Sequence, residues 1–244
     1  FGAAAGAALL GARGNGYSGP EALWRRAGLT RAALEALARG DAFASLGLTR
    51  RAALWAIRAL GPAPLPLFQG LLEGEAQREP AVALPPMELG QAVVADYASL
   101  RLSLRAHPME LLRPDLPGLT PHAGLAEAPA RATVCGLVIT RQRPGTASGV
   151  IFLTLEDETG VCNVVVWPSL YARFRAAVIG GRLLRVAGQV QREGPVIHLI
   201  AAQIEDLSHL LDGLAGPGHS AGPRPRPMHP REQAKALFSS RDFR

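Results

Sequence analysis

The chain has 244 residues, 48% of them hydrophobic and 19% charged, which admits one large or two small domains and excludes a chain that is disordered throughout. The formal net charge of +6, with Lys235 as the only lysine among 26 basic residues, favours nucleic acid over an acidic substrate as the partner. No apolar run reaches the ~20 residues of a membrane span, so we expect no membrane contact.

Residues 1–60 are predicted to form short helices joined by turns that contain glycine, and they carry eight Arg against three acidic residues. Residues 1–12 look like a helix cut off at its start, which suggests a piece of a longer polypeptide. Thr30 and Thr49 are expected N-caps, because a threonine hydroxyl accepts a backbone N–H at the start of a helix. This order of helices and turns indicates an all-α helix-hairpin-helix region.

In such a hairpin, the glycine turn and the next helix N-terminus present backbone N–H groups to a DNA phosphate, and arginines beside them add charge. The candidate DNA-binding residues of this region are Arg39, Gly40, Gly47, Thr49, Arg50 and Arg51. An ordinary helical bundle with a solvated arginine face explains the same pattern, and this segment alone does not separate the two interpretations.

Residues 61–128 are expected to form a proline-rich linker followed by a connecting helix over 86–113, with Asp96 on its solvent side. Within the linker, Leu65, Leu67 and Phe68 resemble the short Leu-Phe peptides by which bacterial polymerases engage the sliding clamp. The leading glutamine of such peptides is absent, and packing onto a neighbouring domain is the alternative.

Residues 129–208 contain five β-branched or alternating runs, with Gly160 in the hairpin between the second and third and a helix over 168–178 between the third and fourth. The expected strands are 134–140, 150–155, 161–167, 182–191 and 196–204. This order is that of an OB-fold, a five-stranded Greek-key barrel that binds oligonucleotides. The whole chain is therefore predicted to be α+β, with residues 209–244 as a flexible basic tail.

Strand alternation predicts a nucleic-acid-binding face on the barrel. If Ile151 and Leu153 point inward, Phe152 points outward as a ring on which a base can stack, and Val165 points outward on the partner strand. The candidate residues are Phe152, Thr154, Asn163, Trp167, Arg185 and Gln189 on the strands, with Arg141, Gln142, Arg143 and Arg192 converging from the loops. The alternative is that the helix after Pro168, or another domain, covers Phe152 and Trp167.

No catalytic residue, metal site or cofactor is predicted for this chain. The acidic run 156–158 is interpreted as a solvated hairpin turn rather than a magnesium site, since alternation splits its carboxylates between faces. Cys135 and Cys162 lack metal-ligand spacing and are expected to be buried thiols in a reducing compartment.

The segments LWRRAGL, LARGDAF, RRAALWA, LSLRAHPMELLR, GLVITRQRPGTASGVIFLTLEDETG, GQVQREG and SRDFR closely resemble the C-terminal region of the error-prone C-family DNA polymerases, relatives of the polymerase III alpha subunit. The stretch 151–160 also resembles the OB module of anticodon-binding domains, in which an aromatic that matches Phe152 stacks on a base. The polymerase resemblance spans almost the whole chain.

This resemblance implies a cytoplasmic protein that acts in damage-induced mutagenesis and translesion synthesis with Mg²⁺ and deoxynucleoside triphosphates. The catalytic domains of the family lie upstream of the matching region, so the chain is expected to be inactive alone. We expect it to grip duplex DNA through its helices and single-stranded template through the barrel. The implied protein partners are the sliding clamp and a Y-family-like accessory mutagenesis protein. The alternatives are a free-standing single-strand-binding or anticodon-binding module, and a module that docks only protein.

Overall fold

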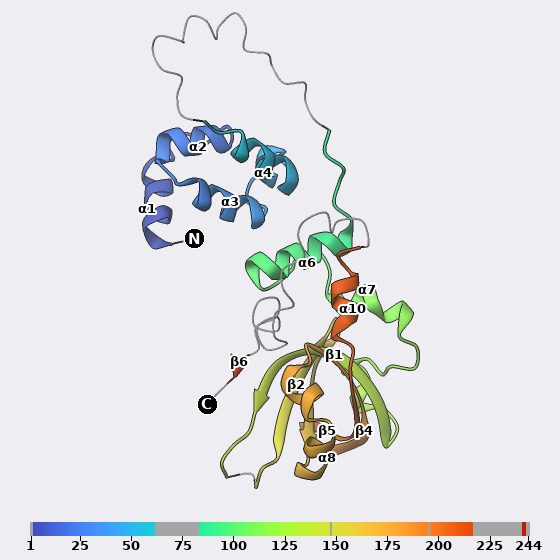
Figure 1. The fold of residues 1–244 in the computed structure, drawn as a ribbon. Coiled ribbons are helices and arrows are strands. Elements are labelled where there is room, and N and C mark those ends of the chain that lie inside the picture. Colours follow the sequence, from blue (N-terminus) through green and yellow to red (C-terminus); the bar gives the residue numbers. More distant parts are fainter. Residues whose placement is uncertain (1, 62–82, 147, 195, 217–240, 243–244) are drawn as a thin grey trace, which may run out of the picture. The chain divides into compact units, whose positions relative to one another are not determined.

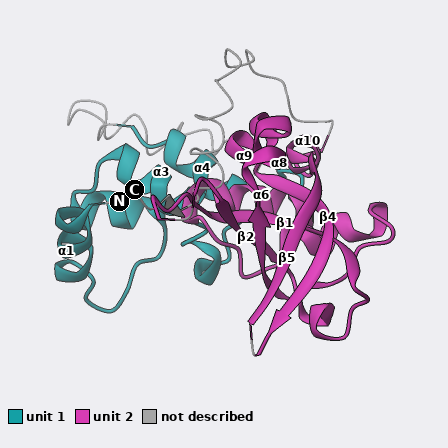
Figure 2. Ribbon diagram, turned by 90° about the horizontal axis from the view of Figure 1, so that it is seen from below, with its two compact units in different colours: residues 1–87 teal, residues 88–244 magenta. Residues whose placement is uncertain are grey.

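The computed structural model describes residues 2–61, 83–146, 148–194, 196–216 and 241–242. The chain forms two compact units, residues 1–87 and residues 88–244 (Figures 1 and 2), and each is described by itself. The boundaries of the four segments expected from the sequence stay a prediction. No helix in the described part is long and apolar enough to cross a membrane.

The first unit is helical, as expected. Its core is built by residues such as Leu34 and Ile57, which are fully buried. Thr30 and Thr49 do cap their helices, since each hydroxyl oxygen accepts a backbone N–H at 3.2 Å. The elements are α1 (Ala3–Gly11), α2 (Pro20–Ala27), α3 (Arg31–Arg39), the short 3-10 helix η1 (Ala44–Leu46) and α4 (Arg50–Arg58).

The second unit begins with α6 (Leu89–Leu100), which ends well before the predicted helix boundary at residue 113. Arg101 takes a left-handed conformation with φ of 65°. Asp96 is buried, contrary to expectation, and its Oδ2 accepts the Ser103 hydroxyl at 2.8 Å and faces Arg105 Nε at 3.4 Å. Both contacts hold residues 103–105 against the Asp96 carboxylate of α6, so the helix does not continue beyond Leu100. The following short elements are α7 (Pro108–Leu112), η2 (Arg113–Asp115) and η3 (His122–Ala126).

Five strands then form a closed barrel, which confirms the predicted OB-fold. Pairing runs β1-β2-β3-β5-β4, and β1 pairs with both β2 and β4, which closes the ring; only β3 and β5 are parallel within it. The strands are β1 (Arg131–Gln142), β2 (Ile151–Asp157), β3 (Gly160–Val166), β4 (Leu183–Glu193) and β5 (Val196–Asp206). A two-residue strand β6 (Arg241–Asp242) lies parallel to Thr140 and Arg141 of β1 (Figure 1).

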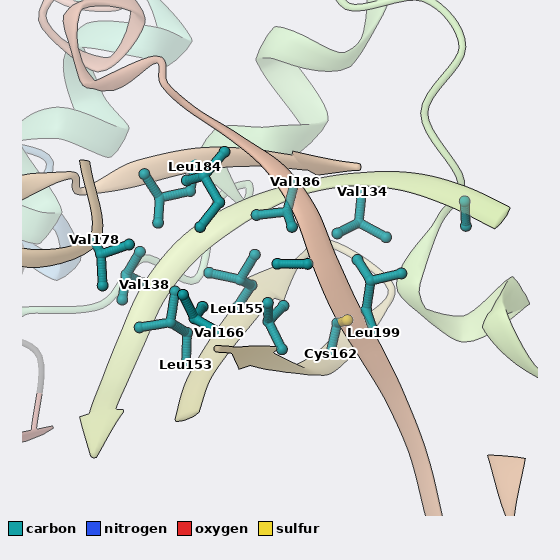
Figure 3. Close-up of a cluster of buried hydrophobic side chains, with 14 of the residues drawn as sticks. Val134, Val138, Leu153, Leu155, Cys162, Val166, Val178, Leu184, Val186 and Leu199 are labelled. Carbon is teal, nitrogen blue, oxygen red and sulfur yellow. The ribbon is translucent and has the colours of Figure 1, made fainter. Parts of the chain in front are cut away.

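The helix predicted over 168–178 is two short helices, α8 (Pro168–Arg173) and α9 (Arg175–Gly180), which meet at Phe174. Val178 of α9 belongs to the barrel core, so this segment contributes to the closed interior. Most other core side chains come from alternate positions of the five strands and converge on the barrel axis (Figure 3), among them Val134, Leu153 and Leu199, and Leu125 of η3 joins them. Such alternation is what the pleat of a half-buried strand requires.

A second apolar cluster lies outside the barrel interior. Cys135 and Leu137 of β1 pack there with α7 and with α10 (Ser208–Gly213). Cys162 lies inside the barrel. Both cysteines are buried free thiols, as expected. Burial raises the pKa of each thiol to about 12. Most of the tail expected over 209–244 lies outside the described residues.

Candidate nucleic-acid interface

The register of the strands places two rows of side chains on the outer surface of the barrel. Residues that pair across neighbouring strands share a face of the sheet. The first row is Gln142, Phe152, Val165, Ile200 and Gln189, and the second is Thr140, Thr154, Asn163, His198 and Gln191. We call these ten residues the strand face. Its first row is apolar in the middle, and its second row is polar throughout.

The strand face contains four of the predicted strand residues. Phe152 and Thr154 are partly exposed, and Asn163 and Gln189 are exposed. The Thr154 hydroxyl lies 3.4 Å from the amide oxygen of Asn163. Val165 is in register with Phe152 and so lies on the outer side of the barrel, as predicted, but only 8% of it is exposed. Its place between larger neighbours in the row accounts for this burial.

Trp167 follows the last residue of β3, two positions after Val165, and is 51% exposed. It forms the N-cap of α8, so the helix starts at this side chain and does not cover it. Neither Trp167 nor Phe152 is buried within the described part of the chain. The strand face therefore keeps an accessible aromatic ring on β2 and a second ring at the end of β3.

Arg141 does not converge on the strand face. A register shift between Val138 and Thr140 inserts an extra residue into β1, and Arg141 consequently pairs with the inward-facing Leu153. Its Nε donates to the carbonyl of Val178 at 2.8 Å, and its Nη2 donates to the carbonyl of Gly181. The side chain thus ties the end of α9 to β1.

Arg192 is also occupied by backbone. Its Nε donates to the carbonyl of Ala126 at 2.9 Å, and its Nη2 donates to the carbonyls of Leu125 and Ala128. Arg185 lies on another side of the barrel, where β4 pairs it with Cys135, and its guanidinium is 3.8 Å from a Glu205 carboxylate oxygen. Of the four predicted loop residues, Gln142, Arg143 and Arg192 are exposed, but the guanidinium of Arg192 is held by the backbone carbonyls.

In the first unit, the predicted residues divide in a similar way. Gly47 has φ of 73° and lies two residues before Thr49, the N-cap of α4. The first backbone N–H groups of that helix have no acceptor within the helix itself. Arg50 is buried at 7% exposure, so its side chain is not presented to solvent as expected. Arg51 donates to the carbonyl of Pro85 at 2.7 Å, and Arg39 pairs with its helix neighbour Glu35 at 2.6 Å. Gly40 ends α3.

The sequence of the first unit also contains an internal repeat. Residues 28–31 read GLTR, and residues 47–50, nineteen positions later, read GLTR again. Gly28 matches Gly47 in its left-handed conformation, with φ of 60° and 73°, and Thr30 matches Thr49 as an N-cap. The first unit therefore contains two equivalent turns, and self-comparison of the sequence would have revealed them.

The acidic turn 156–158 is not the solvated turn predicted. Asp157 is 3% exposed and accepts the backbone N–H groups of His122, Thr159 and Gly160 at 3.0, 2.8 and 3.0 Å. Arg113 Nη2 donates to its Oδ2 at 2.9 Å. Burial opposes ionisation, but the hydrogen bonds from Thr159 and His122 outweigh it and lower the pKa of Asp157.

The Asp157 carboxylate joins the short helices η2 and η3 to the barrel. His122 is buried beside it, with Nδ1 3.2 Å from the carbonyl oxygen of Gly160, and Arg113 also pairs with Glu158. Burial lowers the pKa of His122 and of His107, which caps α7 by accepting the N–H of Met109 at 3.1 Å. The cluster therefore serves the fold, and within the described residues no three His, Cys, Asp or Glu side chains are grouped to hold a metal ion.

Comparison with known proteins agrees with this geometry. Residues 132–207, which include the closed barrel, match the model of a family described as "OB-fold nucleic acid binding domain". The barrel is therefore an OB-fold domain of the nucleic-acid-binding class. A solved asparaginyl-tRNA synthetase from Pyrococcus horikoshii is 25% identical, covering 32% of this chain and 19% of that one, with a TM-score of 0.28.

The chain is 64% identical over 251 residues to the error-prone DNA polymerase of Ruegeria pomeroyi, covering 96% of this chain and 23% of that protein. It is 48% identical over 212 residues to error-prone DNA polymerase 1 of Rhizobium meliloti, covering 84% and 19%. The resemblance predicted from the sequence is confirmed: over most of its length, the chain is similar to one part of the bacterial error-prone DNA polymerases. It spans about a fifth of the length of these curated relatives.

Proposed function

We propose that this chain is a noncatalytic DNA-binding portion of an error-prone DNA polymerase, and that its barrel holds single-stranded template on the strand face. The observation that carries the proposal is the partly exposed ring of Phe152, in register with Val165 and next to the polar pair Thr154 and Asn163. A base can stack on the ring while its edge meets hydroxyl and amide groups in the adjacent row. Gln142 and Gln189 flank the apolar row with further amides.

The helical unit is proposed to contact the duplex. Its two GLTR turns each lead into a capped helix, and backbone N–H groups at such a helix start suit a phosphate. The first sixty residues contain eight arginines and three acidic residues, an excess of five positive charges, which favours a polyanion as the partner. This unit would therefore add affinity without sequence preference.

For the whole polymerase, we propose translesion synthesis in damage-induced mutagenesis, in the cytoplasm, with Mg²⁺ and deoxynucleoside triphosphates at domains outside this chain. The sliding clamp and a Y-family-like accessory protein are proposed as partners. The peptide at Leu65, Leu67 and Phe68, on which direct clamp contact would depend, lies outside the described residues.

Fluorescence anisotropy of the chain with single-stranded DNA, primer-template DNA and RNA tests the barrel's role. Phe152→Ala should weaken binding of single-stranded DNA by about 5- to 150-fold, the equivalent of ~1–3 kcal/mol for one stacked base. Leu104→Ala is the control, because Leu104 is 95% exposed in the same unit and outside the barrel. Equal affinities of the two variants would contradict the stacking role. Tighter binding to structured RNA than to DNA would favour an anticodon-binding module instead.

A matched pair of arginines tests the helical unit. Arg39 and Arg25 each pair with the glutamate four residues earlier, at 2.6 and 2.8 Å. Arg39→Gln should reduce the salt dependence of duplex binding by about 0.9 in the log–log slope, the value for one phosphate contact, while Arg25→Gln should not. The same slope for both variants would remove Arg39 from the proposed interface.

A further inference from the structure

The surface formed by α8, α9 and the loop after β1 carries positive charge that the fold does not use. Residues 141–149 and 168–180 contain four arginines and no acidic residue. Arg141 is spent on the carbonyls at the end of α9, as described above. Arg173 lies with its guanidinium carbon 5.1 Å from the ring centroid of Phe174, on the side of α8 that faces Arg185 and Glu205.

Arg143 and Arg175 share one aromatic ring. The guanidinium carbon of Arg143 lies 5.5 Å from the centroid of Tyr171, and Arg175 Nε donates to the Tyr171 hydroxyl at 3.3 Å. Within the described residues, neither guanidinium meets a carboxylate or a backbone carbonyl. Stacking on a ring fixes an arginine while its N–H groups remain free along the edge, in the fork that matches a phosphate. We call Arg143, Tyr171 and Arg175 the arginine–tyrosine patch.

The patch continues the strand face along the chain. Trp167 follows Val165 by two strand residues, about 7 Å, and Val165 is in register with Phe152. Tyr171 follows Trp167 by four residues, a rise of about 6 Å on the same side of a helix. A Cβ built on Gly149 would lie 3.7 Å from Arg143 Nη2 and 3.6 Å from Pro168 Cγ, so the loop that carries Arg143 rests against the start of α8.

We propose that the arginine–tyrosine patch binds the phosphodiester backbone of single-stranded nucleic acid, as a second segment of the site whose first segment is the strand face. A strand stacked on Phe152 passes Trp167 and reaches two guanidiniums held by Tyr171. The inference rests on the proposed function, because it assumes that the strand face binds a single strand. It adds Tyr171 and Arg175, and a path over α8, to that site.

Anisotropy titrations of the full chain with oligonucleotides of about 4 and about 12 nucleotides, over a series of salt concentrations, test the patch. Arg143→Gln and Arg175→Gln should each lower the log–log salt slope for the longer oligonucleotide by about 0.7, the value for one contact with single-stranded phosphate. The shorter oligonucleotide, held at the strand face, should bind with unchanged affinity. The patch variants should reduce the salt slope by the same amount for oligodeoxythymidine and for oligouridine, because both have the same phosphate backbone.

Arg173→Gln is the matched control, since it removes the same charge two residues before Arg175, at the end of α8 and on the side that faces Arg185 and Glu205. If Arg173→Gln reduces the slope as much as Arg175→Gln does, the effect is general electrostatics and the inference is overturned. Full binding by both patch variants would also overturn it and leave the surface for a protein partner. Circular dichroism confirms that the exposed substitutions leave the fold intact.

The outcomes separate this inference from the proposed function. If Phe152→Ala weakens binding of single-stranded DNA and Arg175→Gln leaves binding unchanged, the strand face remains the binding site and only the patch is removed from it. No binding of any oligonucleotide by the unmodified chain at low salt would remove both. Tyr171→Phe, which keeps the ring under Arg143 and deletes the hydroxyl that Arg175 contacts, should lower the slope less than Arg143→Gln; an equal loss would contradict the stacked arrangement.

Discussion

Replacing Asp157 by alanine should destabilise the second unit more than any other single change in the acidic turn. The carboxylate accepts three backbone N–H groups, the Thr159 hydroxyl and Arg113, and its side chain is fully buried. Alanine would leave those donors in a site too enclosed for bulk water. Because the donors come from η2, η3 and the β2–β3 hairpin, their loss detaches the helical segment from the barrel.

The magnitude follows from the kind of contact that is lost. Breaking a buried, hydrogen-bonded ion pair by removing one partner costs about 3–5 kcal/mol, and each buried N–H group left unpaired costs about 1–3 kcal/mol before relaxation. We therefore expect Asp157→Ala to lower the free energy of unfolding by about 3–5 kcal/mol. Glu158→Ala, which removes the other carboxylate on Arg113 and the acceptor of one backbone N–H, that of residue 158 itself, should cost about 1 kcal/mol.

Urea denaturation followed by tryptophan fluorescence measures this difference. Trp167 is the only tryptophan of the second unit, so a background with Trp24→Phe and Trp55→Phe reports its unfolding alone. The folded-state pKa of Asp157 lies below its ordinary value. The difference in unfolding free energy between the unmodified chain and Asp157→Ala should therefore be constant from pH 7 to about pH 5 and should shrink as pH falls below about 4. A loss below about 1 kcal/mol, or no larger than that of Glu158→Ala, would refute the structural role of this carboxylate.

Three further substitutions or titrations test the fold around the site. Arg141→Met should lower unfolding free energy by about 1.5–3 kcal/mol through the lost carbonyl contacts, measured by the same denaturation, while the affinity of the folded chain for DNA stays unchanged. Gly188→Ala should fail to fold or lose several degrees in Tm, because its Cβ would lie 2.9 Å from the Ile200 carbonyl carbon and closer still to the oxygen. Burial lowers the folded-state pKa of His107 and His122, so the unfolded chain binds more protons below about pH 6.5. Stability should therefore fall as pH drops through 6.5, and a flat profile between pH 7 and 5.5 would contradict their burial as neutral rings.

The barrel could be predicted from the sequence because its determinants are local. Alternating β-branched runs define the strands, and Gly160, with φ of 154°, turns the chain where the acidic run meets the next strand. Phe152 and Asn163 could be placed on one face by period-two counting alone. These residues lie on the straight parts of β2 and β3, where no irregularity disturbs the count.

Arg141 shows why the rest could not be predicted in this way. One extra residue in β1, between Val138 and Thr140, inverts the parity of every later side chain. Nothing in the run VIT marks that position, because the shift is set by pairing with β2. Asp157 was misjudged for a related reason: two of its donors, Arg113 and the His122 N–H, lie more than thirty residues away in the sequence. A turn that looks solvated locally can be buried by a distant segment.

An arginine-rich chain makes charge a poor guide to the nucleic-acid site, because the same side chain also serves as a structural clamp. Arg26 donates to the carbonyls of Ala12, Arg13 and Gly16, and Arg141 and Arg192 make similar sets of contacts to backbone oxygens. A guanidinium in such a setting has spent its donors and gains little from a phosphate. A ring alone does not distinguish a binding arginine, because Arg26 lies over Tyr17 and Arg173 lies over Phe174. A binding arginine also needs N–H groups that no carbonyl has taken and a place that continues the strand face, and Arg143 at Tyr171 meets both conditions. By this criterion the positive end of the barrel's binding path lies at Tyr171, whereas net charge and sequence position alone would have placed it at Arg141.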